Sequence, residues 1–347
     1  MLEPLSNIHF GAESFAKFRE ATLQNEIAIL CDSHTVEHCL PVLLKDFSHL
    51  NNAPVLVIPE GEANKNLDQV SKVYEELLRL NLGRNSVLFN LGGGVITDLG
   101  GFAASTFKRG IQYINIPTTL MGMVDAAIGG KTAVNVNQFR NIAGVFAHPQ
   151  SVFIFPKFLE TLSKVEIQSG WAEMMKHALL TSGQAWEAFQ QYDTLQSPPD
   201  ALIEANARFK ESVVNSDFRD QSRRQILNLG HTTAHAIESW NLQQNLEIPH
   251  GFAVAAGVFI EAEMAMRIGT GLSSGECREI QHYISTQFPK VIIEENSVDE
   301  IIALMRNDKK NKQQITFSLL ESVGLPLVGI EPDETYIRAS ILHYLHA

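Results

Sequence analysis

The chain has 347 residues, a length that predicts about two domains. Because 45% of the residues are hydrophobic and 19% are charged, we expect a folded protein and not a disordered chain. Lys and Arg total 27 against 39 for Asp and Glu, which gives a formal net charge of −12. Because nucleic-acid phosphates would repel such an acidic chain, and its basic residues are scattered, we expect no nucleic-acid partner.

The sequence also argues against membrane insertion and secretion. The apolar stretch 251–260 is about half as long as the roughly 20 residues that span a bilayer. The N-terminal residues lack the basic and apolar regions of a signal peptide, and the three cysteines form no CxxC pair. We therefore expect a soluble, cytoplasmic protein without membrane partners.

Short apolar segments alternate with helical patterns in the first half of the chain. Apolar residues recur at helical spacing over 66–80. Strands are predicted at 26–31, 54–58, 86–89, 113–116 and 151–155. The alternation predicts an α/β domain, with a parallel sheet covered by helices on both faces and ligands at the carboxyl ends of the strands.

Helical patterns dominate after about residue 156. A possible hairpin pairs 314–319 with 325–330. Helices are predicted at 162–180, 199–214, 226–240, 250–268 and 273–288. The chain is therefore expected to form an α/β domain over residues 1–160 and a mainly α-helical domain over 161–347.

Three consecutive glycines, Gly92, Gly93 and Gly94, follow the predicted strand 86–89. Without Cβ atoms the backbone can turn tightly, and the free amides of a following helix can bind a phosphate. The segment lacks the G-x-G-x-x-G pattern of dinucleotide-binding folds. A tight turn without a ligand is one interpretation, but the position in an α/β domain favours a nucleotide or phosphate.

A second glycine-rich segment, GGKT at 129–132, superficially matches the end of a P-loop. The first glycine of that motif would fall at residue 125, which is Asp125, so a P-loop is excluded. The remaining interpretations are a surface loop and a lysine-bearing segment that binds a compact, oxygen-rich substrate.

The second half of the chain contains side chains typical of metal sites. His231 and His235 are four residues apart, a spacing that can chelate zinc, and His250 opens another predicted helix. Glu173 lies on a further predicted helix, beside a lysine on the same face. Thr232 stands where the zinc-protease motif H-E-x-x-H has glutamate, which argues against a protease. Core histidines are an alternative, but the combination favours a divalent metal that acts on a polyhydroxy phosphate.

Several motifs follow one another along the chain: NLGGGVITD at 90–98, PTTL at 117–120, IGGKTAVN at 128–135, WAEMMK at 171–176, NLGH at 228–231 and HG at 250–251. In combination they resemble the motifs of the 3-dehydroquinate synthases, a family of the sugar phosphate cyclase superfamily. The resemblance covers residues from about 32 to about 310. It implies that family's fold, an N-terminal nucleotide-binding domain with a parallel sheet and a C-terminal, mainly helical metal-binding domain.

The resemblance implies a divalent metal ion, zinc or cobalt, held by Glu173, His231 and His250. His235 then contacts the substrate and does not chelate the metal. Arg109 matches an arginine that reaches the substrate phosphate from the neighbouring subunit of a homodimer. The substrate-binding residues implied are Asp125, Lys131, Asn141, Lys176, Lys210, Arg224, Asn228, His235 and Lys309.

NAD is the second cofactor that the resemblance implies. Glu62 and Lys65 match a contact pair on the adenosine side, and Asp32 and His34 align with the same region more loosely. Arg140 stands where the family usually has lysine, which keeps the charge but changes the hydrogen-bond geometry. The other cofactor-binding residues implied are Gly93, Gly94, Asp98, Thr118, Thr119, Lys131, Arg140, Phe158, Thr161 and Glu166.

The implied reaction converts the sugar phosphate 3-deoxy-D-arabino-heptulosonate 7-phosphate into 3-dehydroquinate and phosphate, a step of aromatic amino acid biosynthesis through the shikimate pathway. It proceeds through transient oxidation by NAD, β-elimination of phosphate, re-reduction and an intramolecular aldol, so that NAD is not consumed. Three alternatives remain: another sugar phosphate cyclase, a metal- and NAD-dependent polyol dehydrogenase, and a non-catalytic binding protein. Asn228 and Lys309, which we expect to differ in valiolone-type cyclases, favour the synthase.

Overall fold

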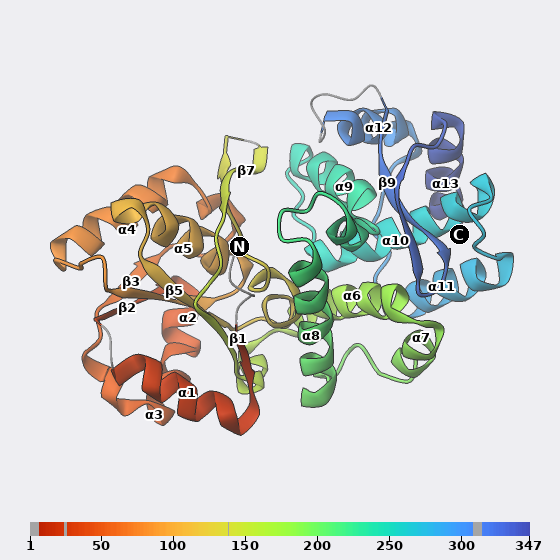
Figure 1. Cartoon of the computed structure of the whole chain (residues 1–347). Coiled ribbons are helices and arrows are strands. Elements are labelled where there is room, and N and C mark those ends of the chain that lie inside the picture. The colour runs from red at the N-terminus through yellow and green to blue at the C-terminus, as the bar shows by residue number, and fades with distance from the viewer. Residues whose placement is uncertain (1–6, 24–25, 138, 308–313) are drawn as a thin grey trace. The chain divides into compact units, whose positions relative to one another are not determined.

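The computed structural model describes residues 7–23, 26–137, 139–307 and 314–347, which form two compact units (Figure 1). The first unit contains the chain up to Ser163 and the segment Pro199–Arg219, and all other residues belong to the second. The segment 199–219 belongs to the first unit because its helix α8 (Asp200–Ser216) packs against the turn Gly122–Ala126 and strand β1 (Asn7–Phe10). The single domain boundary at residue 160 remains a prediction. It does not account for segment 199–219, which belongs to the first unit.

A six-stranded sheet with parallel pairing forms the centre of the first unit, in the order β1-β8-β5-β4-β2-β3. The five predicted strands are all present, and β1 is a further strand at the edge. The strand order reverses between β2 and β4, and crevices at such points bind ligands in α/β folds. The strands are β1 (Asn7–Phe10), β2 (Ile27–Asp32), β3 (Val55–Ile58), β4 (Val87–Gly92), β5 (Gln112–Pro117) and β8 (Ser151–Ile154).

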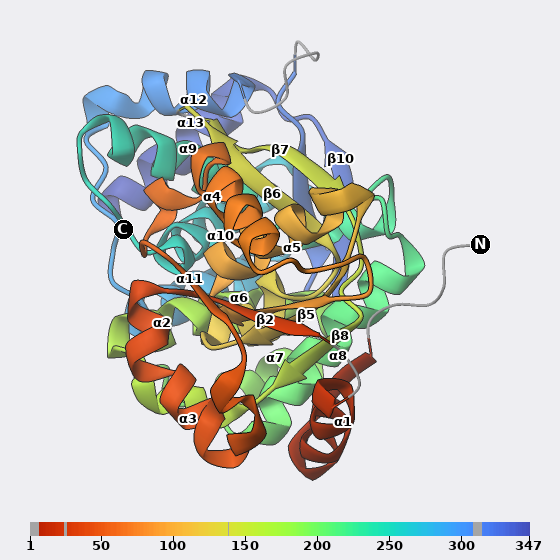
Figure 2. The ribbon, with the colours of Figure 1, turned by 90° about the vertical axis from the view of Figure 1, so that its left-hand side faces the viewer.

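Helices cover both faces of this sheet, as the alternating pattern predicts. One face is covered by α4 (Leu67–Arg79) and α5 (Gly94–Thr106). The other face carries α1 (Gly11–Leu23), α2 (Ser33–His38) and α3 (Leu40–Asp46), as both ribbon views show (Figure 1, Figure 2).

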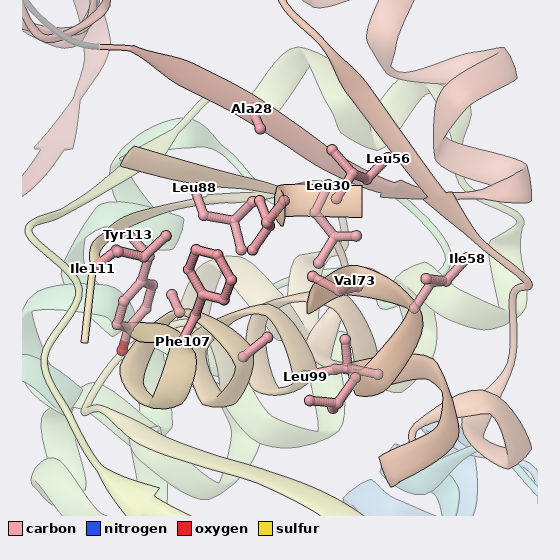
Figure 3. Packing of buried hydrophobic residues seen from close by; sticks show 14 of the residues in the cluster. Ala28, Leu30, Leu56, Ile58, Val73, Leu88, Leu99, Phe107, Ile111 and Tyr113 are labelled. Carbon is pink, nitrogen blue, oxygen red and sulfur yellow. The ribbon is translucent and has the colours of Figure 1, made fainter. Parts of the chain in front are cut away.

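Apolar side chains alternate between the two faces of the sheet. Leu88 of β4 joins Leu30 and Leu99 in the core beneath α4 and α5 (Figure 3). The next residue, Phe89, faces the other way, and its ring centroid lies 5.5 Å from that of Phe18 in α1. Each face therefore buries its own apolar layer, which requires helices on both sides of the sheet.

Small residues let α5 lie close to its neighbours. A Cβ atom at Gly100 would lie 2.0 Å from Asn90 Oδ1, and one at Gly101 would lie 2.5 Å from Thr132 Cγ2. Thr132 belongs to β6 (Lys131–Val136), which pairs with β7 (Phe139–Phe146) in an antiparallel hairpin. The GGKT segment therefore runs into a strand that packs against α5.

The second unit is mainly α-helical, as the sequence predicts, and the predicted hairpin is also present. Helix α10 packs against α6, α9, α11 and α13. The predicted helix at 226–240 begins only at His231, because Gly230 has a left-handed φ of 80° and residues 223–228 form a separate 3-10 turn. The elements are α6 (Lys164–Thr181), α7 (Gly183–Phe189), α9 (His231–Gln243), α10 (His250–Ile268), α11 (Ser274–Gln287), α12 (Val298–Asn307), β9 (Phe317–Ser322), β10 (Leu325–Ile330) and α13 (Glu334–His346).

No helix in the described part of the chain combines the length and the apolar character that a transmembrane span requires.

Candidate metal centre and cofactor-binding residues

Three helices of the second unit bring the predicted metal ligands together. Glu173 lies in the middle of α6, and His231 and His250 are the first residues of α9 and α10. Glu173 Oε1 lies 3.3 Å from His231 Nε2 and 3.6 Å from His250 Nε2. One ligand atom from each residue lies within 4.8 Å of the other two, a spacing suited to a shared cation.

A second partner orients each imidazole. His250 Nδ1 lies 3.2 Å from Glu238 Oε2, and His231 Nδ1 lies 3.1 Å from the carbonyl oxygen of Leu229. Carboxylate and carbonyl oxygens accept hydrogen bonds, so Nδ1 carries a proton in both rings and Nε2 is left as the metal-binding atom. Metal-ligating histidines are commonly held in this way.

A close backbone contact fixes the start of α10 against α6. Gly251 N donates to Ser169 Oγ at 3.0 Å, and a Cβ atom at Gly251 would lie 2.0 Å from the Ser169 carbonyl oxygen. Ser169 lies one helical turn before Glu173 in α6. The glycine of the HG motif therefore allows His250 to reach Glu173.

The electrostatic environment favours a bound cation. Glu173 is buried, and within the described chain neither of its carboxylate oxygens accepts a well-formed hydrogen bond. Burial opposes its charged form, but Lys176, whose Nζ lies 2.5 Å from Oε2, and His231 hold the pKa of Glu173 well below its usual range. Burial lowers the pKa of His231 to about 4, which keeps this ring neutral. At His250 burial is outweighed by Glu238 and Glu173, which raise the pKa to about 10, so a metal ion has to displace a proton there.

A buried carboxylate with two imidazoles is a donor set that zinc takes in catalytic sites, with a fourth position open to water or substrate. The residues of this chain therefore fit a divalent metal ion. His235 lies outside this set, because it is exposed and is absent from the groups of described residues whose ligand atoms lie within 4.8 Å of one another. Chelation by His231 and His235, which the spacing alone indicated, is therefore disfavoured.

The other predicted residues of the second unit are more dispersed. Arg224 is buried and Asn228 half-buried on the 3-10 turn before α9. Glu166 is exposed in the first turn of α6. Lys309 lies outside the described residues.

In the first unit, the predicted phosphate-binding glycines lie at the carboxyl end of β4, beside the reversal of strand order. Gly93 precedes α5 and Gly94 is its first residue. A Cβ atom at Gly92 would lie 2.5 Å from Ile96 Cγ1, and one at Gly93 would lie 2.9 Å from Thr119 Cγ2. Packing by itself thus explains the first two glycines, while the free amides at the start of α5 remain suited to a phosphate.

Asp32 ends β2 on the other side of this reversal. Its Oδ1 accepts hydrogen bonds from Thr35 N at 2.7 Å and Thr35 Oγ1 at 2.9 Å. The Asp32 side chain therefore caps helix α2. His34 is half-buried in the same helix.

A set of polar side chains that we call the Lys65 cluster comprises Glu62, Lys65, Asp98, Asn135 and Asn141. Lys65 Nζ lies 2.5 Å from Asp98 Oδ2 and 2.6 Å from Asn141 Oδ1. Asn135 Nδ2 donates to Glu62 Oε1 at 2.9 Å, and Asn135 Oδ1 accepts from Asn141 N at 2.8 Å. Four residues predicted to bind cofactor or substrate are thus joined, together with Asn135.

A second ion pair joins two predicted substrate residues. Lys210 Nζ lies 2.6 Å from Asp125 Oδ1 and 2.6 Å from the Asp125 carbonyl oxygen. This contact links α8 to the turn Gly122–Ala126 within the first unit.

The remaining predicted residues of the first unit differ in exposure. Thr119 Oγ1 accepts from Gly122 N at 3.0 Å, and Thr161 Oγ1 donates to the Phe158 carbonyl oxygen at 2.7 Å. Thr118 and Phe158 are buried, whereas the cationic side chains of Arg109, Lys131 and Arg140 are exposed.

The sequence predicts no role for Glu238 or Asn135. In the structure Glu238 contacts the metal-ligand candidate His250, and Asn135 contacts Glu62 in the Lys65 cluster. A signal for Glu238 exists, because it lies seven residues after His231 and therefore on the same face of α9. For Asn135 no spacing indicates its partners, which are brought to it by the fold.

Family models for both halves of a known protein match the chain. The 3-dehydroquinate synthase N-terminal model matches residues 55–169, and the C-terminal model matches residues 170–311. The 3-dehydroquinate synthase of Parabacteroides distasonis is 40% identical over 311 residues, which cover 88% of this chain and 88% of that protein. That of Rippkaea orientalis is 35% identical over 308 residues, 86% of this chain and 82% of that protein.

Solved structures share the fold. A 2-deoxy-scyllo-inosose synthase complexed with carbaglucose-6-phosphate, NAD+ and Co2+ has a TM-score of 0.84 at 23% identity, over 97% of this chain and 96% of that one. A 2-epi-5-epi-valiolone synthase from Streptomyces hygroscopicus with NAD+ and Zn2+ bound has a TM-score of 0.82 at 21% identity, over 100% and 98%. An iron-containing alcohol dehydrogenase from Thermotoga maritima reaches 0.63 at 16% identity, over 100% and 99%.

These structures confirm the predicted fold class. The two family models together span most of the chain, and relatives in several organisms exceed 30% identity over most of their length. This chain therefore belongs to the 3-dehydroquinate synthase family.

Proposed function

We propose that this chain is a 3-dehydroquinate synthase, a carbon–oxygen lyase that releases phosphate from 3-deoxy-D-arabino-heptulosonate 7-phosphate and forms 3-dehydroquinate. The observation that carries the proposal is the convergence of Glu173, His231 and His250 in a chain of this family. A family member that only bound a small molecule, without catalysis, would not need three metal-coordinating atoms this close together.

We assign a zinc or cobalt ion to Glu173, His231 and His250, and NAD to the carboxyl ends of β2 and β4 and the start of α5. Related cyclases were crystallised with NAD+ and with Co2+ or Zn2+, which supports both assignments. When bound, NAD supplies reversible hydride transfer, and the metal ion polarises an oxygen of the substrate.

Cationic side chains would bind the two anionic ends of the substrate through charge-assisted hydrogen bonds. Arg224 and Lys176, both buried in the second unit, are assigned to the carboxylate and its neighbouring hydroxyls. Lys210 would have to exchange its partner Asp125 for a phosphate oxygen. The phosphate is assigned to Lys131, Asn141, Lys210 and Arg109, on the family resemblance.

Proton transfer is assigned to His235. It is exposed one helical turn after His231, and its ring lies beside both ligand imidazoles. An imidazole ring can both accept and donate a proton, which suits a proton relay.

We further propose a cytoplasmic homodimer in which Arg109 of one subunit reaches the substrate phosphate of the other. Arg109 is exposed in a turn where Lys108 and Arg109 have φ values of 49° and 69°. The three cysteines are buried and none of them forms a disulfide, which is typical of a reducing compartment.

The test is to incubate the metal-loaded protein with the heptulosonate phosphate and catalytic NAD, and to measure phosphate release and NADH absorbance together. We expect stoichiometric phosphate without accumulated NADH, and loss of the reaction on addition of a chelator. NADH that accumulates without phosphate would identify a dehydrogenase instead. Absence of any reaction would indicate a sister cyclase, to be tested with other sugar phosphates, or a binding protein.

A further inference from the structure

One buried carboxylate of α10 contacts the start of α9. Glu261 is 1% exposed, and its Oε2 accepts a hydrogen bond from Gly230 N at 2.6 Å. Its Oε1 accepts from Thr233 N at 3.2 Å and from Thr233 Oγ1 at 2.9 Å. Helix α9 has no capping side chain at its own N-cap position, Gly230, so Glu261 satisfies its first amides from another helix.

The peptide group between Leu229 and Gly230 connects this carboxylate to His231. Its N–H donates to Glu261, and its carbonyl oxygen lies 3.1 Å from His231 Nδ1. Because a peptide group is planar, a partner that fixes the N–H also fixes the direction of the carbonyl. The negative charge on Glu261 also polarises the peptide, which makes its oxygen a stronger acceptor for the imidazole proton.

The backbone at Gly230 has a left-handed conformation, which contacts with α10 hold in place. Gly230 has a φ of 80°, in the left-handed region. A Cβ atom at Gly257 of α10 would lie 2.0 Å from the Gly230 carbonyl oxygen, so the two backbones touch. Glu261, one turn after Gly257, supplies the hydrogen bonds at the same contact.

We propose that Glu261 is a positioning residue for the metal ligand His231, acting through the Leu229–Gly230 peptide. The equivalent partner of His250 is Glu238, which reaches Nδ1 directly at 3.2 Å. Each imidazole of the metal centre is thus oriented by a buried carboxylate. Glu238 contacts His250 directly, and Glu261 acts on His231 through the peptide group. The inference rests on the metal site of the proposed function.

The test is the affinity and the visible absorption spectrum of bound Co2+ in the full-length Glu261→Gln variant. The amide has the same shape but removes the charge and one of the two acceptor oxygens. We expect the dissociation constant for Co2+ to rise roughly tenfold or more, as for other residues that orient metal ligands. The Co2+ absorption bands should shift, because His231 would no longer be held in the same direction.

Glu263→Gln is the matched control. Glu263 is buried two residues further along α10, and its carboxylate pairs with Arg267 Nε at 2.7 Å and Gln281 Nε2 at 3.1 Å. This variant should lose thermal stability but keep the wild-type Co2+ affinity and spectrum. A merely structural role of Glu261 would make the two variants behave alike.

A Glu261→Gln variant with the Co2+ affinity and spectrum of the wild type would overturn the inference and leave the proposed function intact. If this variant does not fold, Thr233→Ala removes only the 2.9 Å bond to the same carboxylate and should raise the dissociation constant by a smaller factor. An unchanged constant in Thr233→Ala would then overturn the inference. A wild-type chain that binds no Co2+ would remove both the inference and the proposed metal site.

Discussion

The proposed metal centre and the Lys65 cluster differ in how their polar side chains are paired. In the metal centre, ligand atoms of Glu173, His231 and His250 lie within 4.8 Å of one another. The Nδ1 atom of each imidazole contacts an oxygen atom that orients the ring. In the Lys65 cluster, an ammonium, a carboxylate and amides already satisfy one another. A metal ion would still have to displace a proton at His250 and compete with Lys176 for Glu173. The side chains of the Lys65 cluster pair with one another, so a ligand that binds there would have to exchange these contacts. The proposed metal site therefore depends on fixed geometry, whereas the proposed cofactor-binding residues of the Lys65 cluster depend on contacts that can be exchanged.

The largest expected effect comes from breaking the metal centre. Glu173→Gln keeps the shape of the side chain but removes the negative charge that the cation needs. We expect the turnover rate to fall by about 1000-fold or more, because the metal contributes several kcal/mol to such reactions. Turnover and metal content of the purified variant measure this effect.

Glu279→Gln provides the control, since Glu279 is exposed on α11 and accepts only from Trp186 Nε1 and Gln190 Nε2 among its described contacts. A Glu173→Gln protein that kept both its metal and its turnover would contradict the ligand assignment.

An intermediate effect is expected in the Lys65 cluster, and here it falls on stability. Lys65→Met removes the cation from Asp98, whose side chain is only 19% exposed. Breaking a buried pair in this way costs about 3 kcal/mol in the free energy of unfolding, measured by denaturant titration. Addition of Asp98→Asn should recover part of the loss, because a neutral amide needs no cation. A double variant no more stable than Lys65→Met alone would show that the pair is not the source of the effect.

The smallest effect separates the structural and ligand-binding roles of Asp32. Asp32→Ala removes the cap of α2 and should cost about 1 kcal/mol of stability, whereas Asp32→Asn keeps an equivalent cap. Calorimetric binding of NAD to both variants completes the comparison. A role in capping alone leaves the NAD affinity of Asp32→Asn at the wild-type value, and a fall in that variant would show that the charge itself reaches the cofactor.

Much of the fold could be predicted from the sequence because the sheet strands are short apolar runs that turn residues separate. The strand β7 could not be predicted in this way, since most of its residues are exposed and leave no apolar face to detect. The start of α9 was placed too early because the left-handed φ of Gly230 interrupts a continuous helical pattern.

The candidate site shows a different limit. Spacing indicated His235 as the partner of His231, because a four-residue interval reveals only that two side chains share a helix face. The sequence also indicates His250 as a metal-site candidate, because it opens a predicted helix, but its approach to His231 comes from the packing of α10 against α9, which no local pattern encodes. Glu261 is similarly distant from Gly230 and Thr233 in sequence, so no sequence pattern predicts its hydrogen bonds with them.

The return of segment 199–219 to the first unit has a practical consequence for anyone who wishes to produce the units as separate fragments. The chain crosses from one unit to the other at 163/164, 198/199 and 219/220, so no single cut separates them. A fragment ending at Ser163 would lack α8 and expose the surface on which that helix packs. A fragment beginning at Lys164 would carry α8 with its buried Ile203 and Val213 left uncovered. Each unit therefore has to be encoded as a rejoined chain, 1–163 with 199–219 and 164–198 with 220–347.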